Sequence, residues 1–219
     1  MRGNAPSPKE LDRLLRLHGV ELRRDTVEQL WAFHRILVEN NGDGDLTRLR
    51  SFPTIVERHY ADCILPGAFV AKWPSPMIDI GSGAGFPGIP LKIVHPEIEL
   101  TLCEPRPCRV EFLEMAISKL GLKGISVFGH KVTSNSMRLP IQGSISRAFE
   151  AIPKTLVRLE NAMLPGGRAF FLKGPAARDE LKEFRARPVP GWVLDEEHWF
   201  DIPNSTQHRS LIVMKRVSP

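Results

Sequence analysis

The chain has 219 residues, of which 42% are hydrophobic and 25% are charged; this composition is typical of a globular protein and excludes fibrous and disordered classes. No apolar run approaches the roughly 20 residues of a membrane span, and the amino end lacks the apolar core of a secretory signal, so we expect a cytoplasmic protein without a membrane partner. The formal charge of +5 mildly favours a polyanionic partner. The odd cysteine count predicts reduced thiols, and the cysteine spacing predicts no metal.

Residues 1–70 carry helical periodicity without a strand signal, and they predict a helical cap. Ser7 and Pro8 suit the start of a first helix that ends near Gly19. A second helix begins at Asp25, and a third is expected over 53–65. Within the third helix His59 and Asp62 share a face, which fits either a local hydrogen bond or a functional role. Residues 71–219 are expected to form the second unit.

A strand and a glycine loop follow the cap. Residues 77–80 are short and apolar, as in a strand of a buried parallel sheet. The loop after them contains Gly81, Gly83 and Gly85, which allow a sharp turn and a close approach to a ligand. The ligand is expected beyond the carboxyl end of the strand, near a helix N-terminus.

Two cofactor classes compete for this loop. Gly83, Gly85 and Gly88 also match the spacing of dinucleotide-binding folds. Asp79 precedes the first glycine by two residues, and its carboxylate would repel a pyrophosphate. The same carboxylate suits the positive amino acid end of S-adenosylmethionine, so the segment predicts an adenosylmethionine site. A glycine turn without a ligand is the third possibility.

The rest of the chain alternates between strand and helix patterns, which predicts an α/β fold of the doubly wound kind, with a mostly parallel sheet. Helices are expected over 88–94, 108–120, 153–163 and 175–184. A turn is expected at 164–168. Strands are expected over 99–103, 125–128, 144–147, 169–172, 192–199 and 209–215.

Further candidate cofactor residues follow the predicted strands. Glu104 lies about 20 residues beyond the glycines, where an acid accepts hydrogen bonds from ribose hydroxyls in either cofactor class. Val132 and Thr133 follow the third strand, where adenine would lie, and the Thr133 hydroxyl is a possible partner of its amino group.

The fourth strand ends without the acid-proline or asparagine-proline pair that is typical of amine methylation. Arg147 lies there instead, a cation able to hold a carboxylate or phosphate. A ring nitrogen such as guanine N7 needs no base before it attacks a methyl group, so this site favours N7 over an exocyclic amine. Arg58, Lys173 and Arg209 are expected on the same rim, although each alone is also typical of an ordinary surface cation.

The segments 79–90, 109–113, 145–148, 164–166 and 172–174 together resemble the RsmG family, also called GidB. This resemblance implies a seven-stranded class I (Rossmann-like) methyltransferase fold that methylates N7 of guanine 527 in bacterial 16S rRNA. It places S-adenosyl-L-methionine against Gly81 and Phe86, near Val132 and Thr133, and beside Arg147. It also aligns Arg58, His59 and Asp62 with the family's Arg-His-x-x-Asp and puts RNA of the small ribosomal subunit, or its late precursor, across the basic rim.

The chain departs from the family pattern at Asn40–Gly42, Cys108, Thr133 and Ser210. The cofactor is therefore better defined than the substrate. A methyltransferase for another RNA or a small molecule, a non-catalytic RNA-binding protein that keeps the cofactor fold, and a dinucleotide oxidoreductase remain alternatives. We expect a monomer.

Overall fold

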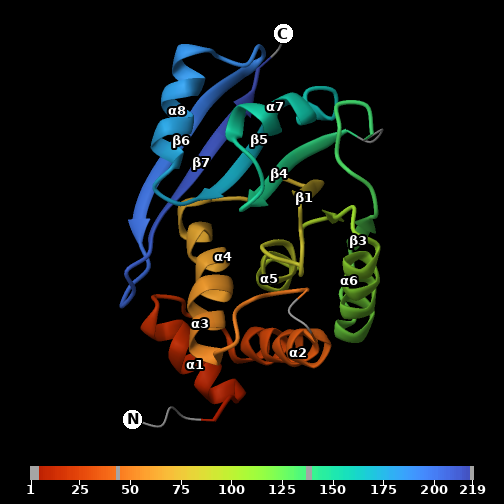
Figure 1. Cartoon of the computed structure of the whole chain (residues 1–219), viewed down its shortest axis with the longest axis vertical. Helices are drawn as coiled ribbons and strands as arrows, with labels where there is room; N and C mark the ends of the chain where they lie inside the picture. The colour runs from red at the N-terminus through yellow and green to blue at the C-terminus, as the bar shows by residue number, and fades with distance from the viewer. Residues whose placement is uncertain (1–4, 43–44, 137–139, 218–219) are drawn as a thin grey trace.

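A computed structural model describes residues 5–42, 45–136 and 140–217 of the chain. Figure 1 shows helices on both sides of a central sheet. The helical segments are α1 (Pro8–Leu17), α2 (Arg24–Asn40), α3 (Phe52–Ile55), η1 (Val56–Ala61), α4 (Asp62–Ile64), η2 (Leu65–Phe69), α5 (Gly88–Val94), α6 (Pro107–Leu120), α7 (Ile152–Leu159) and α8 (Ala177–Ala186). The strands are β1 (Met77–Ile80), β2 (Leu100–Cys103), β3 (Ile125–Phe128), β4 (Ile141–Arg147), β5 (Met163–Lys173), β6 (Trp192–Asp201) and β7 (His208–Arg216).

The seven strands form one sheet in the order β3-β2-β1-β4-β5-β7-β6. Strands β1 to β5 pair in parallel, whereas β7 pairs antiparallel with both β5 and β6. The order reverses between β1 and β4, and ligands of open α/β sheets bind at such a reversal, beyond the carboxyl ends of the strands. The predicted doubly wound, seven-stranded and mostly parallel sheet is confirmed.

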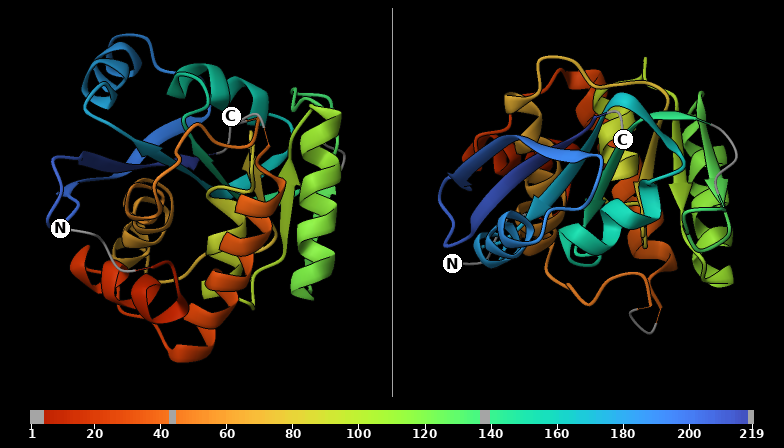
Figure 2. Two further views of the ribbon diagram at one scale, coloured as in Figure 1. Left: turned by 60° about the horizontal axis from the view of Figure 1, so that its bottom comes forward. Right: turned by 90° about the horizontal axis from the view of Figure 1, so that it is seen from above.

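Alternate residues of the strands enter two separate hydrophobic clusters, one on each face of the sheet. On β5, Phe170 and Leu172 join one cluster while Ala169 and Phe171 join the other. The first cluster includes side chains of α5 and α6, and the second includes side chains of α7 and α8. The two-sided layering is visible in Figure 2. A sheet buried on both faces explains the near-continuous apolar strands.

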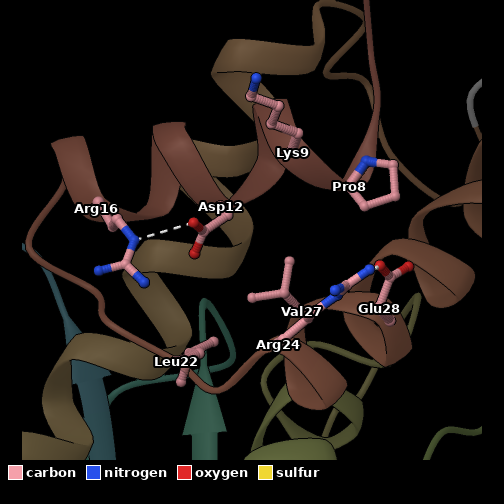
Figure 3. Close-up of a pocket in the computed structure, with 8 residues that line it drawn as sticks. All are labelled: Pro8, Lys9, Asp12, Arg16, Leu22, Arg24, Val27 and Glu28. Carbon is pink, nitrogen blue, oxygen red and sulfur yellow. Dashed lines mark hydrogen bonds and ion pairs between the residues drawn. The ribbon is translucent and has the colours of Figure 1, made fainter.

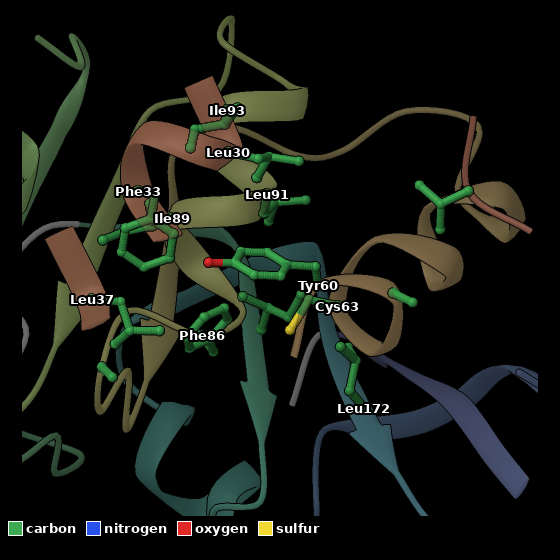
Figure 4. Packing of buried hydrophobic residues seen from close by; sticks show 14 of the residues in the cluster. Leu30, Phe33, Leu37, Tyr60, Cys63, Phe86, Ile89, Leu91, Ile93 and Leu172 are labelled. Atoms are coloured by element: carbon green, nitrogen blue, oxygen red, sulfur yellow. The ribbon is translucent and has the colours of Figure 1, made fainter. Parts of the chain in front are cut away.

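The amino-terminal helices share the first of these clusters rather than forming a core of their own. Tyr60, with none of its surface exposed, packs among side chains of α2 and α5, including Phe33 and Ile89 (Figure 4). Helix α1 begins as predicted, since Ser7 Oγ accepts the Glu10 N–H at 3.1 Å. The hydrophobic packing therefore continues without a break from α1 to the sheet. Within the described ranges, no helix is long and apolar enough to cross a membrane.

Several predicted boundaries were wrong: the helix expected over 153–163 ends at Leu159, and the strand expected over 144–147 begins at Ile141. Two segments also differ in kind from the prediction. The helix expected over 53–65 is a composite, in which a π-helical turn over Val56–Ala61 separates α3 from α4 and a 3-10 segment continues to Phe69. The turn expected at 164–168 is a bulge inside β5, because Ile141 pairs with Met163 while Gly143 pairs with Arg168. An α-helix and a π-helical turn have similar apolar spacing, so the sequence pattern does not distinguish them. The bulge in β5 contains residues that are typical of a turn, so the pattern does not distinguish a bulge from a turn either.

Candidate active site

Several of the predicted site residues come from the carboxyl ends of β1, β2, β4 and β5. Gly81 follows β1, Glu104 follows β2, Arg147 ends β4 and Lys173 ends β5. Because β7 runs in the opposite direction, Arg209 at its start comes to the same edge, where Ser210 pairs with Lys173. Residues far apart in the sequence therefore meet at one edge of the sheet.

Asp79 is fully buried beneath the glycine loop and holds the start of α5. Its Oδ2 accepts the Gly88 N–H at 3.0 Å. Its Oδ1 has no hydrogen-bond partner in the described part of the chain. Burial, the largest cause, raises the pKa of Asp79 to about 7. The carboxyl group thus lies under the loop, and Gly81 and Gly83 turn above it with φ of +75° and +56°.

The raised pKa of Asp79 predicts a pH-dependent stability. The folded protein binds this proton more tightly than the unfolded chain, so the contribution to stability is full below the ordinary aspartate pKa and is lost as pH rises through about 7. Asp79→Asn keeps the neutral form at every pH. From pH 5.5 to pH 8, its free energy of unfolding should rise relative to the wild type by about 2 kcal/mol. Urea unfolding at both pH values measures the difference.

Asp179→Asn is the matched control for this comparison, because the Asp179 side chain is 82% exposed. The free energy of unfolding of Asp179→Asn should differ from that of the wild type by the same amount at both pH values. An equally constant difference for Asp79→Asn would show that the Asp79 carboxyl group is ionised throughout.

Glu104 is held in place by two backbone donors. Its Oε2 accepts the Gly83 N–H and its Oε1 accepts the Arg106 N–H, each at 3.0 Å. Each carboxylate oxygen keeps a second lone pair. Such a carboxylate fits a ribose with two neighbouring hydroxyl groups, and a Cβ placed on Gly83 meets nothing closer than Arg109 Nη1 at 3.5 Å. This part of the loop is therefore open to a ligand.

Phe149 covers the first glycine of the loop and was missed by the sequence analysis. A Cβ on Gly81 would lie 2.6 Å from Phe149 Cδ2. The preceding residue, Ala148, has φ of +50°, which is uncommon for a residue with a side chain. The ring is 38% exposed. No sequence pattern distinguishes Phe149 from a core aromatic residue; only the turn after β4 places it over the loop.

The other predicted cofactor contacts differ in accessibility. Val132 is buried, and its carbonyl accepts a hydrogen bond from Arg158. Thr133 is exposed next to it. Phe86 is buried, with its ring stacked on that of His59 at a centroid distance of 4.4 Å. Only Thr133 of these three presents its side chain freely.

Asp62 binds two arginines that arrive from different strands. Its Oδ2 accepts from Arg147 Nη1 at 3.0 Å, and its Oδ1 accepts from Arg209 Nε at 2.6 Å. Arg147 also donates to the Arg58 carbonyl oxygen at 2.8 Å. The Asp62 and Arg147 side chains are only 6% and 17% exposed. Arg147 therefore fixes the helical segment on the sheet edge, and it would have to leave these partners to hold an anion directly.

His59 is a neutral member of the same network. Burial and the charge of Arg147 lower the pKa of His59 to about 3. Arg147 Nη2 lies 3.0 Å from His59 Nδ1, and because arginine only donates, Nδ1 must accept. The ring proton is then on Nε2, which donates to Thr47 Oγ1 at 2.8 Å. His59 is thus committed at both nitrogens.

A cleft of about 570 Å³ lies between this network and the ends of β4, β5 and β7. Asp62 is its one carboxylate and His59 its one imidazole among the described lining residues, which also include Arg48, Arg58 and Thr47. Arg48 and Arg58 are exposed and make no side-chain ion pair in the described part of the chain. Lys173, in contrast, pairs with Glu180 at 3.0 Å. The accessible cations of the cleft therefore come from the amino-terminal segment.

Another hollow, of about 340 Å³, lies between α1 and α2 (Figure 3). Its charged residues include Asp12 and Arg16, which pair with each other at 3.0 Å. None of its lining residues belongs to a strand end. The described residues contain no group of three or more histidine, cysteine, aspartate or glutamate side chains arranged to hold a metal ion.

The strand order and the pairing of the seven strands are those of the class I, Rossmann-like methyltransferase fold. A solved structure of this fold, a ribosomal protein L11 methylase from Lactobacillus delbrueckii, superposes with a TM-score of 0.57 at 10% identity and covers 74% of this chain and 79% of its own. A structure titled MtNAS in complex with MTA and tNA reaches 0.58 at 14% identity, covering 96% of this chain and 76% of its own. These similarities concern the fold.

Residues 26–193 match the family described as rRNA small subunit methyltransferase G, or GidB, and the chain belongs to this family. It is 38% identical to ribosomal RNA small subunit methyltransferase G 2 of Syntrophobacter fumaroxidans, over 98% of this chain but only 43% of that relative. It is 32% identical to the protein of the same name from Bdellovibrio bacteriovorus, over 93% of this chain and 80% of the relative. The resemblance found in the motifs is confirmed at family level.

Proposed function

We propose that the protein transfers a methyl group from S-adenosyl-L-methionine to N7 of guanine 527 in the 16S rRNA of the small ribosomal subunit. Membership of the methyltransferase G family supports the substrate. The state of the cleft supports the chemistry, because its carboxylate is bound by two arginines and its imidazole is neutral with both nitrogens engaged. The engaged state of the carboxylate and the imidazole is the observation that favours guanine N7 as the acceptor atom.

An acceptor that must first lose a proton needs a free base, whereas guanine N7 has an available lone pair. Neither Asp62 nor His59 is free to take a proton. Catalysis then rests on holding the base in line with the methyl group, and such positioning contributes several kcal/mol to lowering a barrier. Of the possible acceptors, a ring nitrogen fits this cleft best.

Glu104 would hold the cofactor ribose through its free lone pairs, while Gly83 lets the backbone approach the ligand. The bound cofactor supplies a methyl group on a positively charged sulfur. The Phe149 ring lies over Gly81, so a ligand bound at this glycine would contact the ring. Asp79 acts below the loop, by holding the start of α5.

The RNA would lie across the cleft. Arg48 and Arg58 are its accessible phosphate ligands. Arg147, Arg209, His59 and Lys173 support the cleft from within, since each already has a partner. We propose that the helical segment 1–70 and the domain 71–219 act together in this way, as a monomer in the cytoplasm.

The direct test is methyl transfer from labelled S-adenosyl-L-methionine to small subunits that lack the modification. Nuclease digestion should recover the label in 7-methylguanosine at position 527. Label in another nucleoside would refute the proposed acceptor. Absence of label, with S-adenosyl-L-methionine still bound, would favour a different substrate or a non-catalytic RNA-binding role.

A further inference from the structure

A second hollow lies outside the cleft, on the amino-terminal helices. It has a volume of about 280 Å³ and is formed by residues of α2, by α3 and by the loop before α3. Its lining includes the aromatic and apolar residues Trp31, His34, Phe52 and Ile55, and its exposed charged residues are Arg35, Glu39 and Arg50. The function proposed above does not use it.

Three aromatic rings form one wall of this hollow. Trp31 stacks on His34 with ring centroids 5.4 Å apart and planes inclined by 27°. Phe52 meets the Trp31 ring edge-on at 5.8 Å and lies 4.8 Å from the His34 ring. His34 and Phe52 are buried, whereas Trp31 is partly exposed. Burial lowers the pKa of His34 to about 4, so this wall is uncharged at neutral pH.

The rim of the hollow carries two exposed guanidinium groups. Arg35 and Arg50 make no ion pair with a carboxylate in the described ranges, and Arg50 reaches only the carbonyl oxygens of Asn41 and Gly42, at 3.4 Å each. Glu39 is the one acid among the described lining residues. Uncharged rings beside unpaired guanidinium groups suit a single-stranded nucleic acid, whose bases stack on aromatic rings while its phosphates bind arginines.

The hollow and the cleft lie on either side of one short segment. Arg48 and Leu49 line the cleft, and Arg50 and Phe52 line the hollow. Residues two apart are separated by at most about 7 Å along the chain. An RNA strand that reaches the cleft therefore needs only a short further path to bring a nearby nucleotide to the hollow.

We propose that this hollow binds an unstacked base of the substrate RNA, close in sequence to the methylated guanine, against Trp31 and between Arg35 and Arg50. This proposal rests on the proposed function, because the strand is that of the substrate. It assigns RNA recognition to a place separate from the methyl transfer chemistry. Removing the side chains that form this hollow should weaken RNA binding without changing the chemical step.

The test is steady-state methyl transfer to unmodified small subunits by Trp31→Ala. Stacking of one base on an aromatic side chain contributes about 1–3 kcal/mol, so KM should rise about tenfold while kcat and the affinity for S-adenosylmethionine stay unchanged. Trp31→Phe keeps a ring and should retain most of the RNA affinity. Phe69→Ala is the matched control, because this ring is 37% exposed and stacks on His198, away from the hollow and the cleft.

The cationic rim is tested by the salt dependence of RNA binding. Arg35→Ala and Arg50→Ala should each reduce the slope of log affinity against log salt by about 1. Arg185→Ala is the control for these variants, because Arg185 lies on α8, outside the hollow, and pairs with Glu197 of β6. This substitution should leave the slope unchanged. These variants also test the proposal if Trp31→Ala does not fold.

Photocrosslinking separates this proposal from the proposed function. Ultraviolet irradiation of the wild-type protein with unmodified small subunits should link an RNA nucleotide to Trp31 or Phe52, identified by mass spectrometry of the peptides. Such a link without methyl transfer would support the hollow and refute the enzyme. Methyl transfer with a KM for Trp31→Ala within twofold of the wild type, or crosslinks from the hollow to a ribosomal protein only, would overturn the RNA site.

Discussion

Asp62→Ala is expected to lower the free energy of unfolding by about 3–5 kcal/mol, which is the usual effect of removing one partner from a buried ion pair. The substitution leaves Arg147 and Arg209 without their shared carboxylate, at a position where the side chains are 17% and 20% exposed. Urea unfolding followed by circular dichroism at pH 7 measures the change. The cleft should also lose its shape, because the contact between α4 and the strand ends depends on these bonds.

Two comparison variants make this result specific to the buried charge. Asp179→Ala removes an exposed acid that pairs with Lys182, and its effect should be below about 0.5 kcal/mol. Asp62→Ala combined with Arg147→Met removes one of the stranded cations and should recover at least about 1 kcal/mol. A loss below about 1 kcal/mol for Asp62→Ala would show that water or other groups compensate both arginines.

Glu104→Ala is expected to weaken the binding of S-adenosylmethionine by about 10²–10⁴-fold, since two hydrogen bonds to a charged acceptor contribute about 1.5–3 kcal/mol each. Isothermal titration with S-adenosylmethionine or its demethylated product measures the affinity. The substitution also frees the Gly83 and Arg106 N–H groups that now bind the carboxylate, so the loop itself becomes less ordered.

Glu99→Ala is the matched control for Glu104→Ala, because Glu99 is exposed and precedes the same strand at the opposite edge of the sheet. Its cofactor affinity should equal that of the wild type. Glu104→Gln keeps one acceptor oxygen and should lie between the two alanine variants. Unchanged affinity in Glu104→Ala would place the ribose elsewhere and reopen the choice of cofactor.

The fold was predictable because it depends on local patterns. The apolar strands, the glycine turn after β1 and the Ser7 cap each occupy a few consecutive residues, and the structure confirms them. Boundaries failed where two backbone forms share one pattern, as in the π-helical turn over Val56–Ala61 and the bulge in β5.

The site was less predictable, because its shape depends on contacts between distant residues. The sequence separated Asp62 from Arg147 by 85 residues and from Arg209 by 147. Their residue types indicated cations near a cofactor, but only the tertiary structure shows that Asp62 holds them. Phe149 and Thr47 were missed for the same reason. The roles assigned to Glu104, Arg58 and the other site residues remain predictions.

The bond between Asp62 and Arg209 also bears on the order of folding. Contacts between residues far apart in the chain form slowly, because the long intervening segment must first lose much of its freedom. The segment around Asp62 is synthesised early, whereas its second partner, Arg209, belongs to β7 and is synthesised after the other six strands. A chain interrupted before β7 would therefore lack a finished cleft, even with the complete glycine loop, and we expect such an intermediate to be unable to methylate.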